Sequence, residues 1–140
     1  MYSIKIFKVI QHLVIKEGDK MNSKWGIYPW FKEHGSDLVH PADLEAFTQE
    51  AKNSKVFECI EDNEYLILKY NSNCYRVKDK LFKTVPTPKY YFGEIVKIKE
   101  NDEEAIITDI MWHCGKQEHY YLISIRGKKK SKRYSETEFV

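Results

Sequence analysis

The 140-residue chain is poor in the residue types that build catalytic loops, disulfide frameworks and membrane spans. It has only 6 glycines, and it lacks a phosphate-cradling glycine loop, a G-x-S-x-G nucleophile turn and an H-E-x-x-H zinc motif. Its 3 cysteines are odd in number and form no C-x-x-C pair, which argues against a disulfide framework and favours reduced thiols in a cytoplasmic protein. No apolar run approaches the roughly 20 residues that span a bilayer, so we expect no membrane partner.

Charge is nearly balanced, with 23 basic and 21 acidic residues and a formal net charge of +2. The total charge therefore gives no reason to expect nucleic acid or an acidic membrane as a partner. Aromatic residues make up 14% of the chain and include 10 tyrosines, which favours half-buried pleated surfaces and hence β structure. The length suits one ordinary domain or two very small units packed together.

The last third of the chain predicts a small, strongly bent antiparallel sheet. Apolar runs at 95–98, 105–112 and 120–125 are separated by polar turns, and Arg126-Gly127-Lys128 turns the chain toward Lys132-Arg133-Tyr134. Short strands with tight turns in this layout are typical of a five-stranded barrel. Barrels of this kind usually serve as binding platforms.

Residues 21–85 predict a second β-rich unit with one short helix. Pro41 suits the first turn of a helix that continues to Phe47. Pro29 disfavours a central strand, so we predict an irregular stretch or an edge strand at 25–31. Strands with Asn and Asp at their turns are expected at 56–60, 64–70 and 74–77.

Two prolines at 86 and 88 mark an extended joint between this unit and a C-terminal unit at 89–140. The first twenty residues require a separate interpretation. In A/T-rich codons, Glu17-Gly18-Asp19 encodes the purine-rich sequence of a bacterial ribosome-binding site shortly before Met21. We therefore predict that residues 1–20 are an upstream extension that is not translated, or a disordered segment.

A basic cluster between 126 and 133 is the main candidate binding site. Cations neutralise phosphates and exposed aromatic rings stack on bases, so this cluster and its neighbouring aromatic residues could hold nucleic acid. The acidic turn 100–104 could instead neutralise it, and lysines also protect a sheet edge from aggregation. An acidic protein partner is a further alternative. The candidate binding residues are Trp112, Tyr120, Lys128, Lys129, Lys130, Lys132, Arg133 and Tyr134.

Metal and catalytic sites are not predicted. His113, Cys114 and His119 lie close in sequence, but without paired short spacing they are interpreted as residues of strand ends and turns. We therefore expect no metal and no cofactor. One group of titratable side chains could form an acid–base site, although helix capping explains it as well: His34, Ser36, Asp37, His40 and Asp43. Trp25, Trp30 and Trp112 are expected in the core, with an aromatic groove as the alternative.

The C-terminal third resembles SH3-like or KOW-like small β-barrel proteins of bacterial origin, from an uncharacterised family. The resemblance rests on Phe92-Gly93-Glu94-Ile95-Val96, on Ala105-Ile106-Ile107, and on Lys132-Arg133-Tyr134 followed by Glu138 and Phe139. It implies binding of peptides, RNA or partner domains and transfers no functional residue. The chain also resembles small bacterial proteins that include toxin-neutralising immunity proteins.

These observations predict a mainly-β fold (β-rich α+β) with two small SH3-like barrel units and one short helix. The predicted function is a non-enzymatic binding module for protein–protein interaction, with an immunity or regulatory role as one version. A protein partner is favoured. The alternative is a nucleic-acid-binding protein that uses the basic hairpin 126–133.

Overall fold

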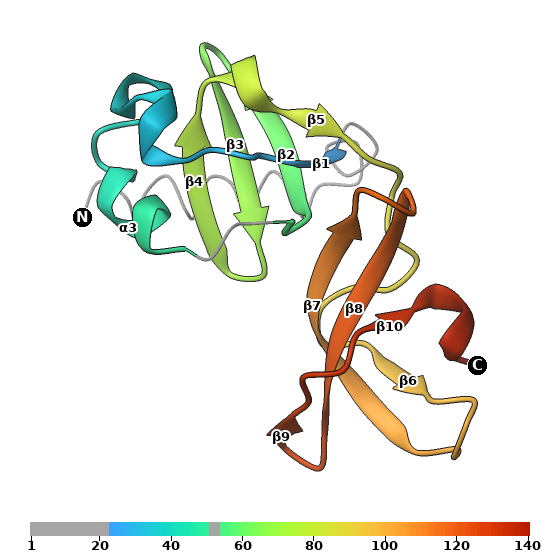
Figure 1. Ribbon diagram of the computed structural model, residues 1–140. Helices are drawn as coiled ribbons and strands as arrows, with labels where there is room; N and C mark the ends of the chain where they lie inside the picture. The colour runs from blue at the N-terminus through green and yellow to red at the C-terminus, as the bar shows by residue number, and fades with distance from the viewer. Residues whose placement is uncertain (1–22, 51–53) are drawn as a thin grey trace.

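The computed structural model describes residues 23–50 and 54–140. Within these residues the chain forms two antiparallel sheets and one α-helix, which confirms the mainly-β class. Figure 1 shows the two sheets at opposite ends of an elongated molecule, with β9 at the end farthest from the first sheet. The residues 1–20, for which we predicted an upstream extension or disorder, lie outside the described residues.

The first sheet has five strands in the order β4-β3-β2-β1-β5. Asn63 and Asn71 have φ angles of 56° and 55°, and asparagine tolerates this left-handed conformation at the tight turns on either side of β3. The strands are β1 (Lys24–Ile27), β2 (Phe57–Asp62), β3 (Tyr65–Tyr70), β4 (Asn73–Val77) and β5 (Lys83–Thr84). Its helical segments are η1 (Lys32–His34), η2 (Ser36–Leu38), α3 (Leu44–Gln49) and η3 (Asp79–Leu81).

The prediction of an irregular stretch or edge strand at 25–31 was correct for residues 28–31, which are irregular, and wrong for residues 25–27, because β1 lies inside the sheet between β2 and β5. β1 ends at Ile27, so the proline that cannot donate a hydrogen bond lies beyond the ladder. The close approach of β5 depends on Gly26. A Cβ atom at this position would lie against the Phe82 ring and 2.5 Å from the carbonyl oxygen of Lys83.

The second sheet also has five strands: β10, β8, β7 and β6 lie in that order, and β9 pairs with β8. Its elements are β6 (Ile95–Lys97), β7 (Glu104–His113), β8 (Glu118–Ile125), β9 (Lys128–Lys129), β10 (Tyr134–Ser135) and the 3₁₀ helix η4 (Glu136–Glu138). The strand ladder closes in neither sheet, so both units are open sheets rather than the barrels we predicted. In the second sheet, β9 and β10 have only two residues each.

The two sheets are joined through β7, which changes partner along its length. Its first half pairs with β6, and a register shift between Ile107 and Asp109 follows. Its second half pairs with the residues just before β2, through bonds from the Val56 amide to the Ile110 carbonyl (3.0 Å) and from the Trp112 amide to the Ser54 carbonyl (2.8 Å). A bulge of this kind redirects a strand. The second half of β7 then pairs with the segment before β2, and this pairing joins the two sheets.

Two large apolar clusters fill the molecule. The first lies between α3 and the first sheet and includes Trp30, Phe47 and Phe57, which are buried. The second lies within the C-terminal sheet and includes Ile110, Trp112 and Tyr121, together with residues that precede the joint. Trp30 and Trp112 are therefore core residues, as expected, and Trp25 packs half-buried against the second cluster. No helix of the described residues is long and apolar enough to cross a membrane.

Candidate binding grooves on the C-terminal sheet

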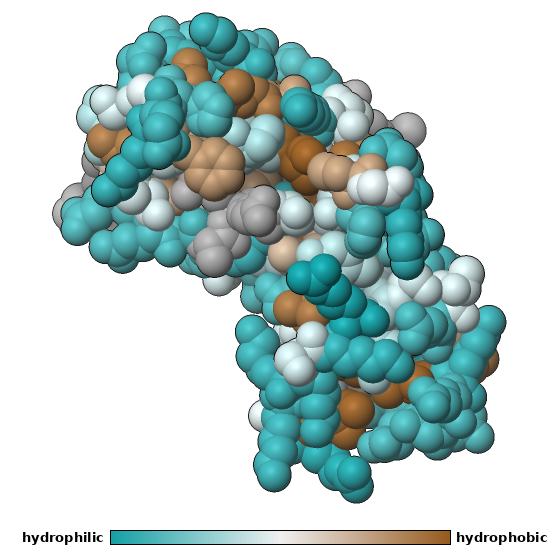
Figure 2. Space-filling model, in the orientation of Figure 1, coloured by the Kyte–Doolittle hydropathy of each residue, from teal (hydrophilic) through white to brown (hydrophobic). Residues whose placement is uncertain are grey.

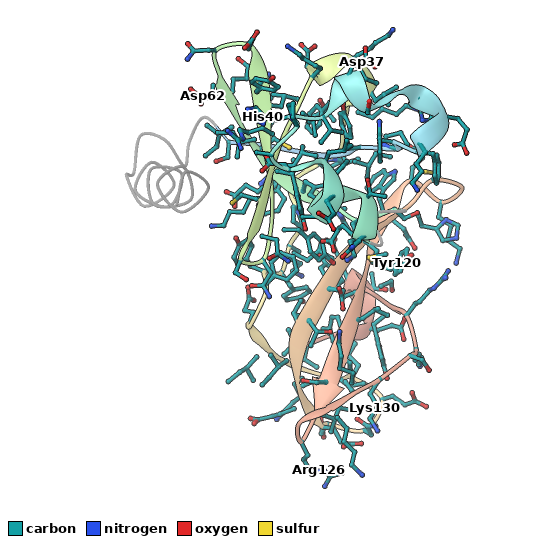
Figure 3. All side chains as sticks on the ribbon, turned by 90° about the vertical axis from the view of Figure 1, so that its left-hand side faces the viewer. Asp37, His40, Asp62, Tyr120, Arg126 and Lys130 are labelled. Carbon is teal, nitrogen blue, oxygen red and sulfur yellow. The ribbon has the colours of Figure 1, made fainter. Side chains whose placement is uncertain are left out.

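A groove of about 640 Å³ lies at the end of the second sheet where β8 turns into β9. Arg126 and Gly127 form the turn with φ angles of 51° and 80°, the left-handed pair that connects two strands tightly. Figure 3 shows Arg126 and Lys130 at the end of the molecule away from Asp37 and Asp62. We call it the turn groove; its lining residues include Glu103, Ile125, Arg126, Lys128, Lys130, Ser131, Lys132 and Tyr134.

Charge in the turn groove is only partly neutralised. Arg126 pairs with Glu103 at 3.3 Å. Lys132 lies 3.6 Å from Glu138 and 3.9 Å from Glu100. Lys128 and Lys130 are exposed and make no ion pair with any of the described residues. The net positive charge of the groove therefore comes from these two lysines.

A second groove, of about 380 Å³, lies near the β7–β8 turn and the junction with the first sheet. The guanidinium of Arg133 covers the ring of Tyr120, with 5.0 Å between the guanidinium carbon and the ring centre. This arrangement is a cation–π contact at the surface. We call it the junction groove; it is lined by Ser54, Met111, Trp112, His113, Cys114, Gly115, Tyr120 and Arg133.

The structure thus divides the eight residues of the single predicted site. Lys128, Lys130, Lys132 and Tyr134 line the turn groove, and Trp112, Tyr120 and Arg133 line the junction groove. Lys129 lines neither groove and pairs with Asp109 at 3.5 Å.

The predicted aromatic residues offer little open ring surface. Trp112 is 6% exposed and Tyr134 is 8% exposed, so both rings belong to the core. The ammonium of Lys132 lies 4.7 Å from the centre of the Tyr134 ring. Tyr120 is half-buried, and Arg133 covers its ring.

Sequence reasoning missed several lining residues. Ser54 could not be predicted because it reaches the junction groove through the pairing of β7 with the segment before β2, more than fifty residues away in sequence. Glu103 was part of the acidic turn that we considered as a counter-charge, and its pair with Arg126 places it in the turn groove. Ile125 and Ser131 gave no chemical signal in the sequence.

The histidines considered as metal ligands have separate local roles. His113 accepts a hydrogen bond at Nδ1 from the Lys116 amide at 3.1 Å. Nε2 of His119 lies 2.6 Å from the Pro86 carbonyl, which ties β8 to the joint. Among residues 23–50 and 54–140, no group of three or more potential ligands lies close enough to hold a metal ion.

The titratable group between 34 and 43 is also engaged in local structure. His34 accepts the Phe31 amide at Nδ1 (2.9 Å), and His40 accepts the Ala42 amide at Nδ1 (3.0 Å). Asp43 accepts hydrogen bonds from the amide and the guanidinium of Arg76, at 2.9 and 2.8 Å. The bonds of Asp43 anchor the start of α3 to β4.

Two of the three thiols have raised pKa values. Burial raises the pKa of Cys74 to about 11, and burial also raises the pKa of Cys59 far above its ordinary value. The thiolate is the nucleophilic form of cysteine, so both side chains are unreactive near neutral pH. All three cysteines are free.

Fold and grooves together define a mainly-β protein with two joined antiparallel sheets, the second of which carries a basic turn groove and the junction groove. A sequence model of a protein family matches residues 17–140. The chain belongs to this family, which is described as a family of unknown function (DUF6960). No curated protein matches the chain significantly. No solved structure does so either.

Proposed function

We propose that this protein is a non-enzymatic binding module that docks a partner protein in the turn groove. The observation that carries the proposal is the pair of exposed lysines, Lys128 and Lys130, which have no acidic partner within the described residues. Cations without a counter-charge at a concave surface attract a partner of opposite charge and orient its approach.

The character of the surface supports recognition by charge. On the face drawn in Figure 2, hydrophilic side chains dominate the second sheet and leave only small hydrophobic patches. A polar, charged surface of this kind is typical of reversible association rather than of an obligate dimer interface. The proposal includes an immunity or regulatory role, because both act through the binding of another protein.

The element order of the second sheet supports an SH3-like likeness. After η4, the last residues return beside β6, where Ile98 and Phe139 form a bridge and the Lys99 amide donates to the Glu138 carbonyl at 2.9 Å. We also propose a bacterial, cytoplasmic protein. The three free thiols support a reducing compartment.

Nucleic-acid binding is the second candidate, supported by the concentration of six cations between 126 and 133. Single strands are usually held by cations together with open aromatic rings on which bases stack. Burial of Trp112 and Tyr134 and the cover over Tyr120 remove that second component. We therefore favour a protein partner.

The test is affinity capture from the native cell with the tagged full chain, with and without nuclease treatment. Two variants are compared with the unaltered chain: Lys128→Glu/Lys130→Glu in the turn groove, and Lys80→Glu/Lys83→Glu as a control. The control makes the same change in net charge at two exposed lysines of the N-terminal unit, Lys80 in η3 and Lys83 in β5. We expect a stoichiometric protein that survives nuclease and is retained by the control but lost by the groove variant.

Two results would overturn the proposal. Recovery of nucleic acid alone, lost on nuclease treatment, would establish the second candidate instead. A protein partner that both variants retain would place the interface outside the turn groove.

A further inference from the structure

The edge of the second sheet next to β8 is interrupted between β9 and β10. Ser124 pairs with Lys129, and Tyr121 pairs with Tyr134. β8 therefore advances three residues (121 to 124) while the edge chain advances five (129 to 134). The two additional residues on the edge chain make segment 130–133 bow away from β8. The edge of a sheet tolerates such a bulge.

This bowed segment has main-chain groups without partners. All four of its residues are exposed. The Lys130 amide donates to the Ile123 carbonyl at 2.8 Å. The amides of Ser131, Lys132 and Arg133 donate to no acceptor among the described residues. Exposed amides on a sheet edge are able to pair with a further strand.

The same segment also connects the two grooves. Lys130, Ser131 and Lys132 line the turn groove, and Arg133 lines the junction groove. Cations follow one another at every second position, at 128, 130 and 132. Side chains of an extended chain alternate between its two faces with the same period.

We propose that the occupant is an extended acidic segment of the partner protein, lying along residues 130–133 from the turn groove to the junction groove. Carboxylates at alternate positions of this segment contact Lys128 and Lys130, and one near its end contacts Arg133. Because the Lys130 amide faces β8 and successive amides of an extended chain alternate in direction, the main chain of the acidic segment accepts hydrogen bonds from the amides of Ser131 and Arg133. This inference rests on the function proposed above and adds the chemistry and the binding mode of the partner.

Charge complementarity favours an acidic polypeptide over other occupants. A polypeptide supplies both the carboxylates for the cations and the carbonyl acceptors for the amides, whereas a nucleic acid would need open rings that the predicted aromatic residues do not offer. Lys132 already lies near Glu100 and Glu138, so its charge is shared. The binding energy is therefore expected to depend mainly on Lys128, Lys130 and Arg133.

The experiment is isothermal titration calorimetry of the full chain with a synthetic eight-residue peptide of alternating Glu and Ser. A peptide of alternating Gln and Ser and an oligothymidylate of similar length serve as comparison ligands. The protein variants are Lys128→Glu/Lys130→Glu, Arg133→Gln, and the control Lys80→Glu/Lys83→Glu. Amide hydrogen exchange with and without the Glu–Ser peptide reports on the main chain of residues 131–133.

We expect binding of the Glu–Ser peptide to weaken by about tenfold or more in the Lys128→Glu/Lys130→Glu variant, because like charges then face each other. Arg133→Gln should weaken it by about threefold to tenfold, and the control should bind as the unaltered chain does. Exchange of the amides of Ser131 and Arg133 should slow on binding. Slowed exchange separates main-chain pairing from a diffuse attraction between charges.

The inference is overturned if the Glu–Ser peptide binds no more tightly than the Gln–Ser peptide, or if the oligothymidylate binds more tightly than both. Unchanged exchange at the Ser131 and Arg133 amides overturns the strand-like mode. If the chain alone forms oligomers and the Lys128→Glu/Lys130→Glu variant does not, the occupant is a second copy of the chain, and the inference is also overturned. If these peptide experiments fail while affinity capture still yields a partner that the groove variant loses, the proposed function stands and this inference alone is wrong.

Discussion

Replacing Tyr70 by phenylalanine should weaken the connection between the two sheets. The side chain of Tyr70 starts from β3 and crosses to β7, where its hydroxyl donates to Asp109 Oδ1 at 2.9 Å and accepts the amide of Ile110 at 3.2 Å. Tyr70 is only 4% exposed. The Tyr70→Phe variant keeps the ring and its packing, so it removes only these two hydrogen bonds and a weaker contact of the hydroxyl with Met111 Sδ at 3.8 Å.

The size of the effect follows from what the substitution leaves behind. A buried donor or acceptor that loses its partner costs about 1–3 kcal/mol of unfolding free energy. The Ile110 amide follows the register shift in β7 and has the Tyr70 hydroxyl as its acceptor. Asp109 keeps its contacts with Thr108 and Lys129, so the free-energy cost of its lost hydrogen bond is smaller than that of the Ile110 amide. We expect a total loss of about 2 kcal/mol, dominated by the amide.

The measurement is urea unfolding followed by tryptophan fluorescence and by circular dichroism. Tyr91→Phe is the matched control, because the Tyr91 hydroxyl donates to Glu58 at 3.2 Å but its side chain is 38% exposed. Water reaches the tyrosine end of this bond, although Glu58 is only 9% exposed, so the control should cost about 1 kcal/mol, less than Tyr70→Phe. The reasoning is refuted if Tyr70→Phe costs less than about 0.5 kcal/mol or no more than the control.

Three further predictions concern stability. Gly26→Ala should lower the free energy of unfolding in urea by about 2 kcal/mol or more, since the new methyl group would lie 2.5 Å from the Lys83 carbonyl oxygen. In the control Gly115→Ala, the nearest atom to the new methyl group is His113 Cε1 at 3.2 Å, so the loss should stay below about 1 kcal/mol. Equal losses in the two variants would contradict this reasoning. Asp43→Ala should cost about 3 kcal/mol, because Arg76 loses a carboxylate that binds its amide and its guanidinium, and an unchanged urea midpoint would show that the pair contributes nothing. Alkaline pH should destabilise the fold. Burial raises the pKa of Tyr91 to about 12, and it raises further the pKa values of Tyr28, Tyr70, Tyr75 and Tyr121. These side chains therefore keep their protons in the folded state, whereas the unfolded chain releases them above about pH 10. The stability that they contribute is complete below about pH 10 and falls as the pH rises toward 12; urea midpoints that stay constant from pH 9 to pH 11 would rule this out.

Most strands could be predicted from the sequence because their signals are local. The runs at 56–60, 64–70 and 105–112 lie within or beside β2, β3 and β7, since alternating apolar residues and Asn- or Asp-containing turns act over only a few residues. β1 was misplaced for the opposite reason. Its position between β2 and β5 depends on contacts with residues 57–59 and 83–84, which no local pattern near Trp25 reveals.

The positive charge of the candidate site could be read from the sequence, but the shape of the two grooves could not. The basic residues between 126 and 133 were visible in the sequence, and so was the acidic turn that faces them. Which lysines have a counter-charge was not visible, because Lys129 meets Asp109 through the pairing of β7, β8 and β9, and Lys132 meets Glu138 through the return of the C-terminal residues. The sequence also could not show that Trp112 and Tyr134 are buried, since burial depends on what packs against a ring from elsewhere.

By itself, the sequence determined a mainly-β chain with short strands, Asn- and Gly-containing turns and a concentrated basic segment, because these properties follow from neighbouring residues. The tertiary structure alone decided that β7 joins the two sheets through Ser54 and Val56 and that the basic segment bows between two grooves. The physical reason is the same in each case. Register, burial and ion pairing depend on atoms brought together from distant parts of the chain, and only the folded packing selects among the partners that the sequence allows.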